Sequence, residues 1–171
     1  YNWTNWDDTE RNAFHHNGFF AWAMSGGVLI DVRFYANQIG PNYSLVKAGE
    51  ASRANHSTSG IYVQGRIRDL IVYNNVFIGN SNDAPANGFL TVRPEGDFSD
   101  VGIYNNTFKG SGTGRAIYIG QGNGVYTVKN KLAMDVGTFI SSIYAYYSRL
   151  VADYNLGYGL LVRQEYSYSI S

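Results

Sequence analysis

Cysteine is absent from the 171 residues, which excludes a disulfide framework, a thiolate metal site and a cysteine nucleophile. Charge is scarce as well: 13 Lys+Arg balance 13 Asp+Glu, and charged residues make up 15% of the chain where about 25% is usual. This composition lacks the basic footprint of a nucleic-acid-binding protein, so nucleic acid is not a predicted partner. No apolar run approaches the ~18 residues that span a bilayer, so no membrane span is predicted.

Glycine and tyrosine are what the chain has in excess. It contains 20 glycines in 171 residues, about 12% against a usual share of ~7%, and it contains 15 tyrosines. This composition is typical of a protein rich in strands and turns. The length suits one domain, and we predict that residues 1–171 form a single one.

One phrase with the pattern D-φ-x-φ-Y-x-N-x-φ, where φ is apolar, occurs three times. The copies are residues 31–39, 69–77 and 100–108, and weaker copies follow at 125–133 and 149–157. The alternation has a period of two residues, which is the period of a β-strand and not of a helix. The paired asparagines fit a tight corner, because Asn tolerates the left-handed backbone conformation.

A second strand-like segment precedes each phrase. These segments are residues 18–22, 60–64, 88–92, 116–120 and 140–146, and 159–163 begins another. The equivalent positions 37, 75, 106, 131 and 155 are separated by 38, 31, 25 and 24 residues. Units this short cannot bury an apolar face alone and must stack on their neighbours, which predicts a solenoid. The two longer steps predict loop insertions at 40–58 and 79–87, and residues 1–14 are a predicted N-terminal cap.

The chain resembles the right-handed parallel β-helix proteins of the pectate-lyase-like superfamily. The resemblance is carried by Val72 to Phe77, by Ile103 to Phe108, and by an opening segment from His15 to Phe20, and it covers roughly residues 15–165. It implies an all-β, right-handed parallel β-helix of about five to six rungs. It also implies a secreted or cell-surface protein whose partner is a polysaccharide, bound along the outer face of one sheet.

A row of tyrosines offers a binding track for that polysaccharide. Tyr62, Tyr118 and Tyr144, with Thr91 between the first two, are expected to line up along the axis about 4.8 Å apart. Sugar rings stack on aromatic faces, but the same row also fits a ladder that only stabilises the sheet. Trp22 and Gln64 are further predicted substrate-binding residues. A second row consists of Tyr35, Tyr73 and Tyr104. It has the same two interpretations, a glycan-binding track or a ladder that only stabilises the sheet.

A polysaccharide lyase needs a cation that neutralises a uronate carboxylate and a base that removes the neighbouring proton. Arg93 is the predicted cation, and His15 or His16 is the predicted base. The hydrolases of this fold use an aspartate where this chain has Asn17, so a lyase is favoured over a glycoside hydrolase if the protein is catalytic.

Asp7 and Asp8 are weak candidates for metal ligands, because adjacent carboxylates with imidazoles nearby suit Ca²⁺. No cofactor is required by this hypothesis, and Ca²⁺ is an optional one.

The alternative hypothesis is a non-catalytic, structural or glycan-binding β-helix segment of a surface or fibre protein. Residues 165–171 alternate as a strand and carry one charge and no proline. A strand of this kind exposes an edge that invites pairing. We therefore expect self-association through this strand, or a larger parent chain.

Overall fold

The described part of the protein is built entirely from β-strands. The computed structural model describes residues 17–23, 26–41, 59–79, 88–94, 100–110, 114–120, 124–142 and 148–158. These residues contain strands β1 to β17 and no helix. They accordingly include no helical segment with the length and hydropathy that crossing a bilayer requires. The expected all-β class is confirmed.

Three parallel sheets of five strands each form the body of the fold. Sheet 1 contains β1 (Asn17–Trp22), β5 (Ser59–Gly65), β9 (Gly88–Pro94), β12 (Arg115–Ile119) and β15 (Thr138–Ser142). Sheet 2 contains β3 (Arg33–Tyr35), β7 (Leu70–Tyr73), β10 (Val101–Tyr104), β13 (Gly124–Lys129) and β16 (Ser148–Asp153). Sheet 3 contains β4 (Gln38–Ile39), β8 (Val76–Ile78), β11 (Thr107–Lys109), β14 (Leu132–Met134) and β17 (Leu156–Tyr158). A short fourth sheet pairs β2 (Leu29–Ile30) with β6 (Ile67–Arg68).

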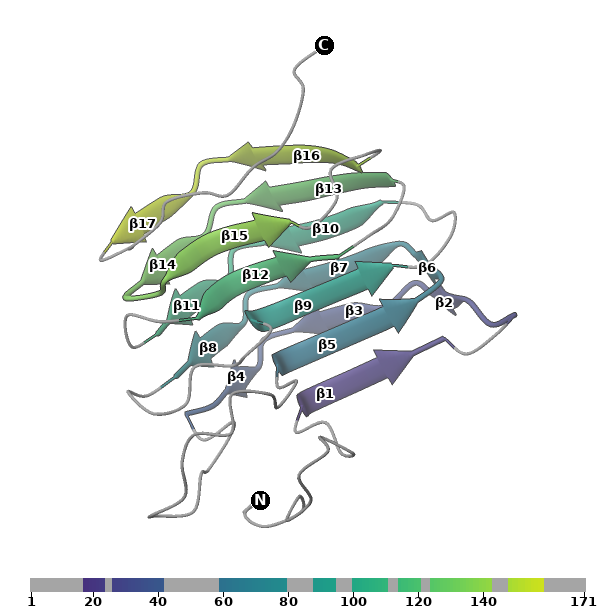
Figure 1. Ribbon diagram of the computed structural model, residues 1–171, viewed down its shortest axis with the longest axis horizontal. Coiled ribbons are helices and arrows are strands. Elements are labelled where there is room, and N and C mark those ends of the chain that lie inside the picture. The colour runs from purple at the N-terminus through teal and green to yellow at the C-terminus, as the bar shows by residue number, and fades with distance from the viewer. Residues whose placement is uncertain are drawn as a thin grey trace.

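The chain visits the three large sheets in turn and then returns to the first. In every sheet the strands are ordered as in the sequence, so each pass through the sheets, here called a layer, lies on the one before it (Figure 1). This arrangement is that of a parallel β-helix or solenoid. The sequence repeats coincide with the layers: Phe34 pairs with Val72, Val72 with Ile103, and Ile103 with Val128.

The space between the sheets is filled by the apolar residues of the repeated phrase. Leu70, Val72, Val101, Ile103 and Phe108 are all buried, as the period of two predicts. Two other residues expected in this core, both in the first layer, are only partly buried, because their layer has a described neighbour on one side only. They are Val32 and Phe34.

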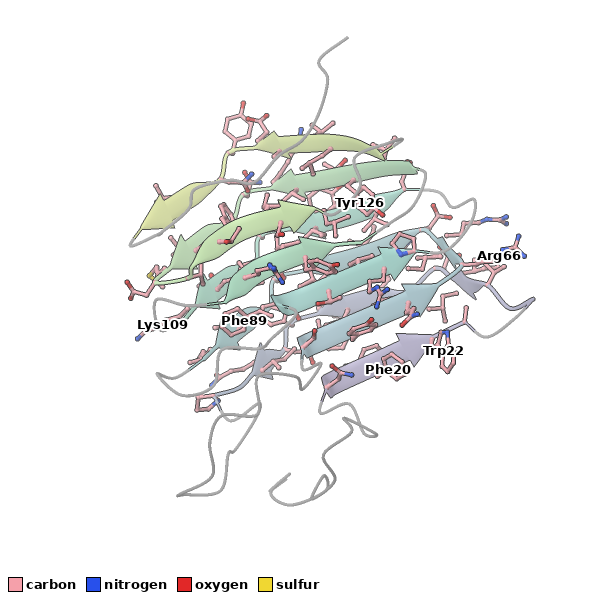
Figure 2. All side chains as sticks on the ribbon, viewed as in Figure 1. Phe20, Trp22, Arg66, Phe89, Lys109 and Tyr126 are labelled. Atoms are coloured by element: carbon pink, nitrogen blue, oxygen red, sulfur yellow. The ribbon has the colours of Figure 1, made fainter. Side chains whose placement is uncertain are left out.

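Aromatic rings continue this core on the side of sheet 3. Phe77 and Phe108 stack with their ring centroids 4.8 Å apart. Phe89, which is labelled in Figure 2, packs against both rings from the start of β9. The interior is therefore a continuous apolar column that runs through the layers.

The corner between sheets 2 and 3 repeats one backbone conformation. The residue that follows each sheet 2 strand has a positive φ between 52° and 55°; these residues are Ala36, Asn74, Asn105, Asn130 and Tyr154. Three of the five are asparagine, which adopts this conformation at the lowest cost after glycine. The predicted asparagine corner is confirmed.

The next residue in each of the first three corners is an asparagine, and these residues form a ladder of amides in which Asn75 and Asn106 are buried. The backbone N–H and the Nδ2 of Asn37 both donate to Oδ1 of Asn75 at 3.0 Å, and those of Asn75 both donate to Oδ1 of Asn106 at 2.9 Å. Asn75 also donates to the backbone carbonyl oxygen atoms of Phe34 and Tyr73. One side chain thus holds three layers together.

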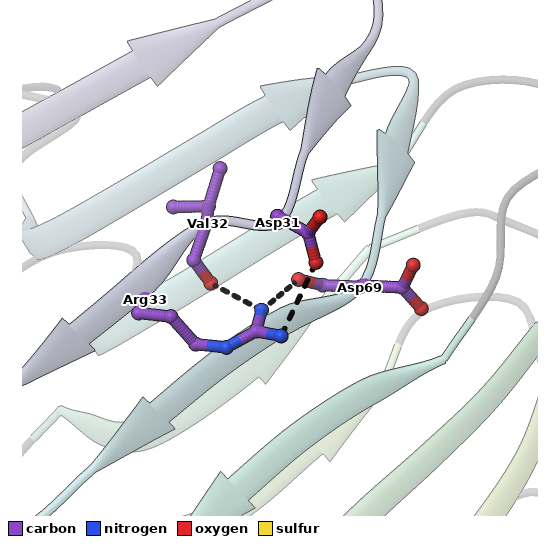
Figure 3. A network of polar contacts seen from close by, with 4 residues as sticks. All are labelled: Asp31, Val32, Arg33 and Asp69. Atoms are coloured by element: carbon purple, nitrogen blue, oxygen red, sulfur yellow. Dashed lines mark hydrogen bonds and ion pairs between the residues drawn. The ribbon is translucent and has the colours of Figure 1, made fainter.

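An opposite corner, before sheet 2, is held by an arginine. Asp31 and Asp69 both have positive φ, and Arg33 donates to Oδ1 of Asp31 at 3.2 Å and to the backbone oxygen of Asp69 at 2.6 Å (Figure 3). Val101 pairs with Leu70, so Asp100 lies beside Asp69. The three aspartates occupy equivalent positions, as the repeat predicts.

Replacing Asn75 by alanine is expected to lower the free energy of unfolding by about 2–4 kcal/mol, because buried donors and acceptors in three layers lose their partners. Urea denaturation followed by circular dichroism measures the loss. Asn74→Gly at the preceding residue is the control: its positive φ suits glycine, so stability should be unchanged or slightly higher. Equal losses in the two variants would contradict a specific role of the ladder amide.

Candidate functional site

The outer face of sheet 1 carries the row that contains the predicted tyrosine track. Phe20 of β1 pairs with Tyr62, Tyr62 with Thr91, and Thr91 with Tyr118. The next position in the row is Ser141, because β15 pairs Ser141 with Tyr118. The expectation that Tyr144 follows Tyr118 is therefore wrong in register, and Tyr144 itself lies outside the described residues.

A second row lies two residues further along the same strands. Trp22 pairs with Gln64, and Gln64 pairs with Arg93. Gly120 lies beside Arg93, because the preceding residues Ile119 and Val92 are paired. An indole, an amide and a guanidinium thus stand on adjacent strands, followed by a position without a side chain.

The aromatic residues of the two rows differ greatly in exposure. Trp22 is 52% exposed and Phe20 is 46% exposed, whereas Tyr62 is only 2% exposed. The rings of Phe20 and Trp22 stand together on β1 with their centroids 6.3 Å apart (Figure 2), and Phe20 meets Tyr62 edge-on at 5.4 Å. Phe20 and Trp22 are therefore the most exposed aromatic residues of the two rows, Tyr118 is half-buried, and Tyr62 is buried beside Phe20.

Arg93 is held in place from two sides. Its Nη1 donates to the hydroxyl oxygen of Tyr62 at 2.9 Å, while its aliphatic stem lies over Gly120. A Cβ at Gly120 would be only 2.8 Å from Cγ of Arg93, closer than real side chains approach. The missing side chain of Gly120 therefore allows Arg93 to lie across the outer face, and Tyr62 fixes its direction.

The charge of sheet 1 has one sign only. Its five strands contain two arginines, Arg93 and Arg115, and no lysine, aspartate or glutamate. The guanidinium of Arg115 lies 5.4 Å from the centroid of the Tyr118 ring, in a cation–π contact. The outer face of this sheet is thus suited to an anionic ligand.

The other predicted site residues cannot be placed. His15, His16, Asp7 and Asp8 lie outside the described residues, so the predicted base and the predicted Ca²⁺ ligands stay predictions. The described segments hold no group of three or more His, Cys, Asp or Glu side chains that would suit a metal ion.

The second tyrosine row stacks only in part. The rings of Tyr35 and Tyr73 are nearly parallel with centroids 4.9 Å apart, but the ring of Tyr104 folds over Gly102, where a Cβ would clash with it. This row is therefore a stacked pair on sheet 2 followed by a ring in a different position.

Sequence reasoning missed Phe20 and Gly120 as members of the site. Phe20 lies two residues before Trp22 and so shares its face of β1, a signal that the period of two already contained. Gly120 had no such signal, since its role appears only when Arg93 is placed beside it.

The difference in burial leads to a test on stability. Tyr62→Ala should lower the melting temperature by several degrees, because it removes a buried ring, whereas Trp22→Ala should change it by less than about 2 °C. Differential scanning calorimetry measures both. A larger drop for Trp22→Ala than for Tyr62→Ala would show that the exposed ring supports the fold.

Comparison with known proteins identifies no relative: no family model, no curated protein and no solved structure matches the chain. The function of the outer face therefore has to be inferred from its own residues.

Proposed function

We propose that this protein binds an acidic polysaccharide on the outer face of sheet 1, as a right-handed parallel β-helix module of the pectate-lyase-like type that works outside the cell. The observation that supports binding is the row Trp22, Gln64 and Arg93 on a sheet without carboxylates. Each member of the row offers a different contact to one sugar chain.

The exposed Trp22 ring, widened by Phe20, presents an apolar surface on which a sugar ring can stack. Gln64 offers both a donor and an acceptor for sugar hydroxyls. Arg93 offers a planar cation that matches the geometry of a uronate carboxylate. Trp22 and Arg93 are two strand spacings apart, about 10 Å, so a ligand that touches both must span more than one sugar residue.

Elimination is the reaction that this surface suits best if the protein is catalytic. In that reaction a base removes the proton from the carbon beside the uronate carboxylate, and a cation stabilises the negative charge that develops there. A carbon–carbon double bond then forms as the neighbouring carbon–oxygen bond breaks, and the leaving oxygen takes up a proton. Arg93 supplies such a cation, whereas the predicted bases, His15 and His16, lie outside the described residues. Binding is therefore the conclusion here, and lyase activity is a further outcome of the same experiments.

The first experiment compares polygalacturonate with its fully methyl-esterified form, which has the same sugar backbone but neutral, methylated carboxyl groups. Titration calorimetry should show tighter binding of the free acid. Arg93→Gln should weaken that binding about 10–100-fold, since a hydrogen bond to a charged group is worth about 1.5–3 kcal/mol. Trp22→Ala should weaken binding of both forms.

Tyr35→Ala is the matched control, because Tyr35 is also an exposed aromatic residue but lies on sheet 2. It should bind as the parent protein does. Unchanged affinity in both Trp22→Ala and Arg93→Gln would refute the proposal. Ultraviolet absorbance of unsaturated uronate products, with and without added Ca²⁺, reports lyase activity in the same samples.

Gly120→Ala tests the position of Arg93 without changing any charge. The new methyl group has to displace the stem of Arg93, which should weaken binding of the free acid about 3–10-fold and leave the methyl ester less affected. Calorimetry with the same two ligands decides. If the variant binds the free acid as tightly as the parent protein does, then Arg93 does not need its position over Gly120 in order to contact the ligand.

A further inference from the structure

A lysine takes the place of an asparagine in the buried ladder. Thr107 pairs with Leu132, and Leu132 pairs with Leu156, so Lys131 lies between Asn106 and Asn155. It is only 2% exposed. Its Nζ donates to the backbone oxygen of Lys129, just as Nδ2 of Asn75 donates to that of Tyr73. The amine thus reproduces one of the contacts of the missing amide.

The acceptor of the missing amide is harder to replace. In the preceding layers, the backbone N–H of each asparagine donates to Oδ1 in the following layer. The N–H of Asn106 has no Oδ1 at position 131 to receive it. A neutral amine has a lone pair that accepts a hydrogen bond, whereas an ammonium group has three donors and no acceptor. Only the neutral form of Lys131 can therefore continue the ladder.

The groups around Lys131 do little to favour its charged form. The ring of Tyr104 on β10 has its centroid 5.7 Å from Nζ, a weak cation–π contact. Lys129 on β13 adds a like charge and pairs with Asp153 of β16 at 4.0 Å, and Tyr154 follows at the corner. No carboxylate among the described residues pairs with Lys131 itself. Burial accordingly lowers the pKa of Lys131 from 10.5 to about 7.

We propose that Lys131 is a proton-controlled joint in the solenoid: the neutral amine continues the ladder from Asn106, and protonation weakens the junction between the layer of Lys131 and the preceding layer, which holds β10 and β11. Backbone hydrogen bonds cross the same junction next to the amine. Asn105 N–H donates to the oxygen of Lys129, and Leu132 N–H donates to the oxygen of Asn106.

The direction of the pH dependence follows from the two pKa values. The folded pKa, about 7, is lower than the unfolded one, 10.5, so between these values the unfolded chain binds a proton that the folded chain does not. Stability therefore rises with pH through this window. Below pH 7 both states carry the proton, and the contribution of Lys131 is constant and at its least favourable.

Urea unfolding at about pH 7.5 and about pH 9 tests the joint in a range where few ordinary side chains titrate, since the chain has no cysteine. For the parent protein, the unfolding constant should fall by nearly tenfold per pH unit. In Lys131→Met this slope should be lost. Lys131→Asn, which restores the ladder amide, should be as flat as Lys131→Met and more stable than the parent protein at neutral pH.

Lys109→Met is the matched control, because Lys109 is an exposed lysine on β11. It should keep the slope of the parent protein. A slope that persists in both Lys131 variants would overturn the proposal, and so would a parent protein without any slope. If Lys131→Met does not fold, Lys131→Asn alone decides.

Hydrogen exchange locates the effect. Corrected for the intrinsic pH dependence of exchange, the protection of the Leu132 amide, which donates to the oxygen of Asn106, should fall on the order of 10–30-fold from about pH 8.5 to about pH 6 in the parent protein, and not in Lys131→Asn. Amides of β5 should keep their protection. An equal loss in all sheets would mean that the whole fold responds and that Lys131 is no local joint.

Discussion

The fold depends on one requirement: each layer has to leave sheet 2 at the same place as the layer beside it. The buried asparagine amides meet this requirement, since one Oδ1 receives two N–H groups from the adjacent layer while the Nδ2 of the same side chain binds carbonyl oxygen atoms. A corner that shifted by one residue would leave these groups unpaired inside the protein, at a cost of about 1–3 kcal/mol each. The register of sheets 2 and 3 follows from this corner, and with it the alignment of the rows on the outer faces of these two sheets.

The parts of the fold that the sequence predicts are those that leave a local trace. Alternation of apolar residues marks the strands, and Asn74 and Asn105 mark the corner, because few residues accept a positive φ. The register of sheet 1 leaves no such trace. It is set by the path from one sheet to the next, and the path from β14 to β15 includes Asp135, another residue with positive φ. For this reason Ser141, and not Tyr144, lies beside Tyr118.

The candidate site shows what the alternation of side chains along a strand can and cannot predict. Phe20, Trp22 and Tyr62 lie on the same face of sheet 1, yet two are exposed and one is buried. The difference arises because β5 has a neighbouring strand on both sides and Arg93 beside its tyrosine, whereas β1 is the outermost described strand. Exposure is a property of the assembled layers, and the direction of Arg93 depends on a glycine that lies 27 positions later in the chain. Neither can be obtained from one repeat alone.

The solenoid also places the two proposed roles next to each other. Each layer touches only the layers next to it, so a local change passes to its neighbours and weakens with each step. Arg93 lies on β9, whereas Gly120, which leaves room for its stem, follows β12 in the layer that contains Lys131. Protonation of Lys131 would therefore act on the junction that the stem of Arg93 crosses, while Trp22 and Gln64 on β1 and β5 lie further from it. A pH-dependent joint in this position suits a surface whose contact with the anionic part of a sugar chain changes with pH, and does not suit one whose stacking contact changes.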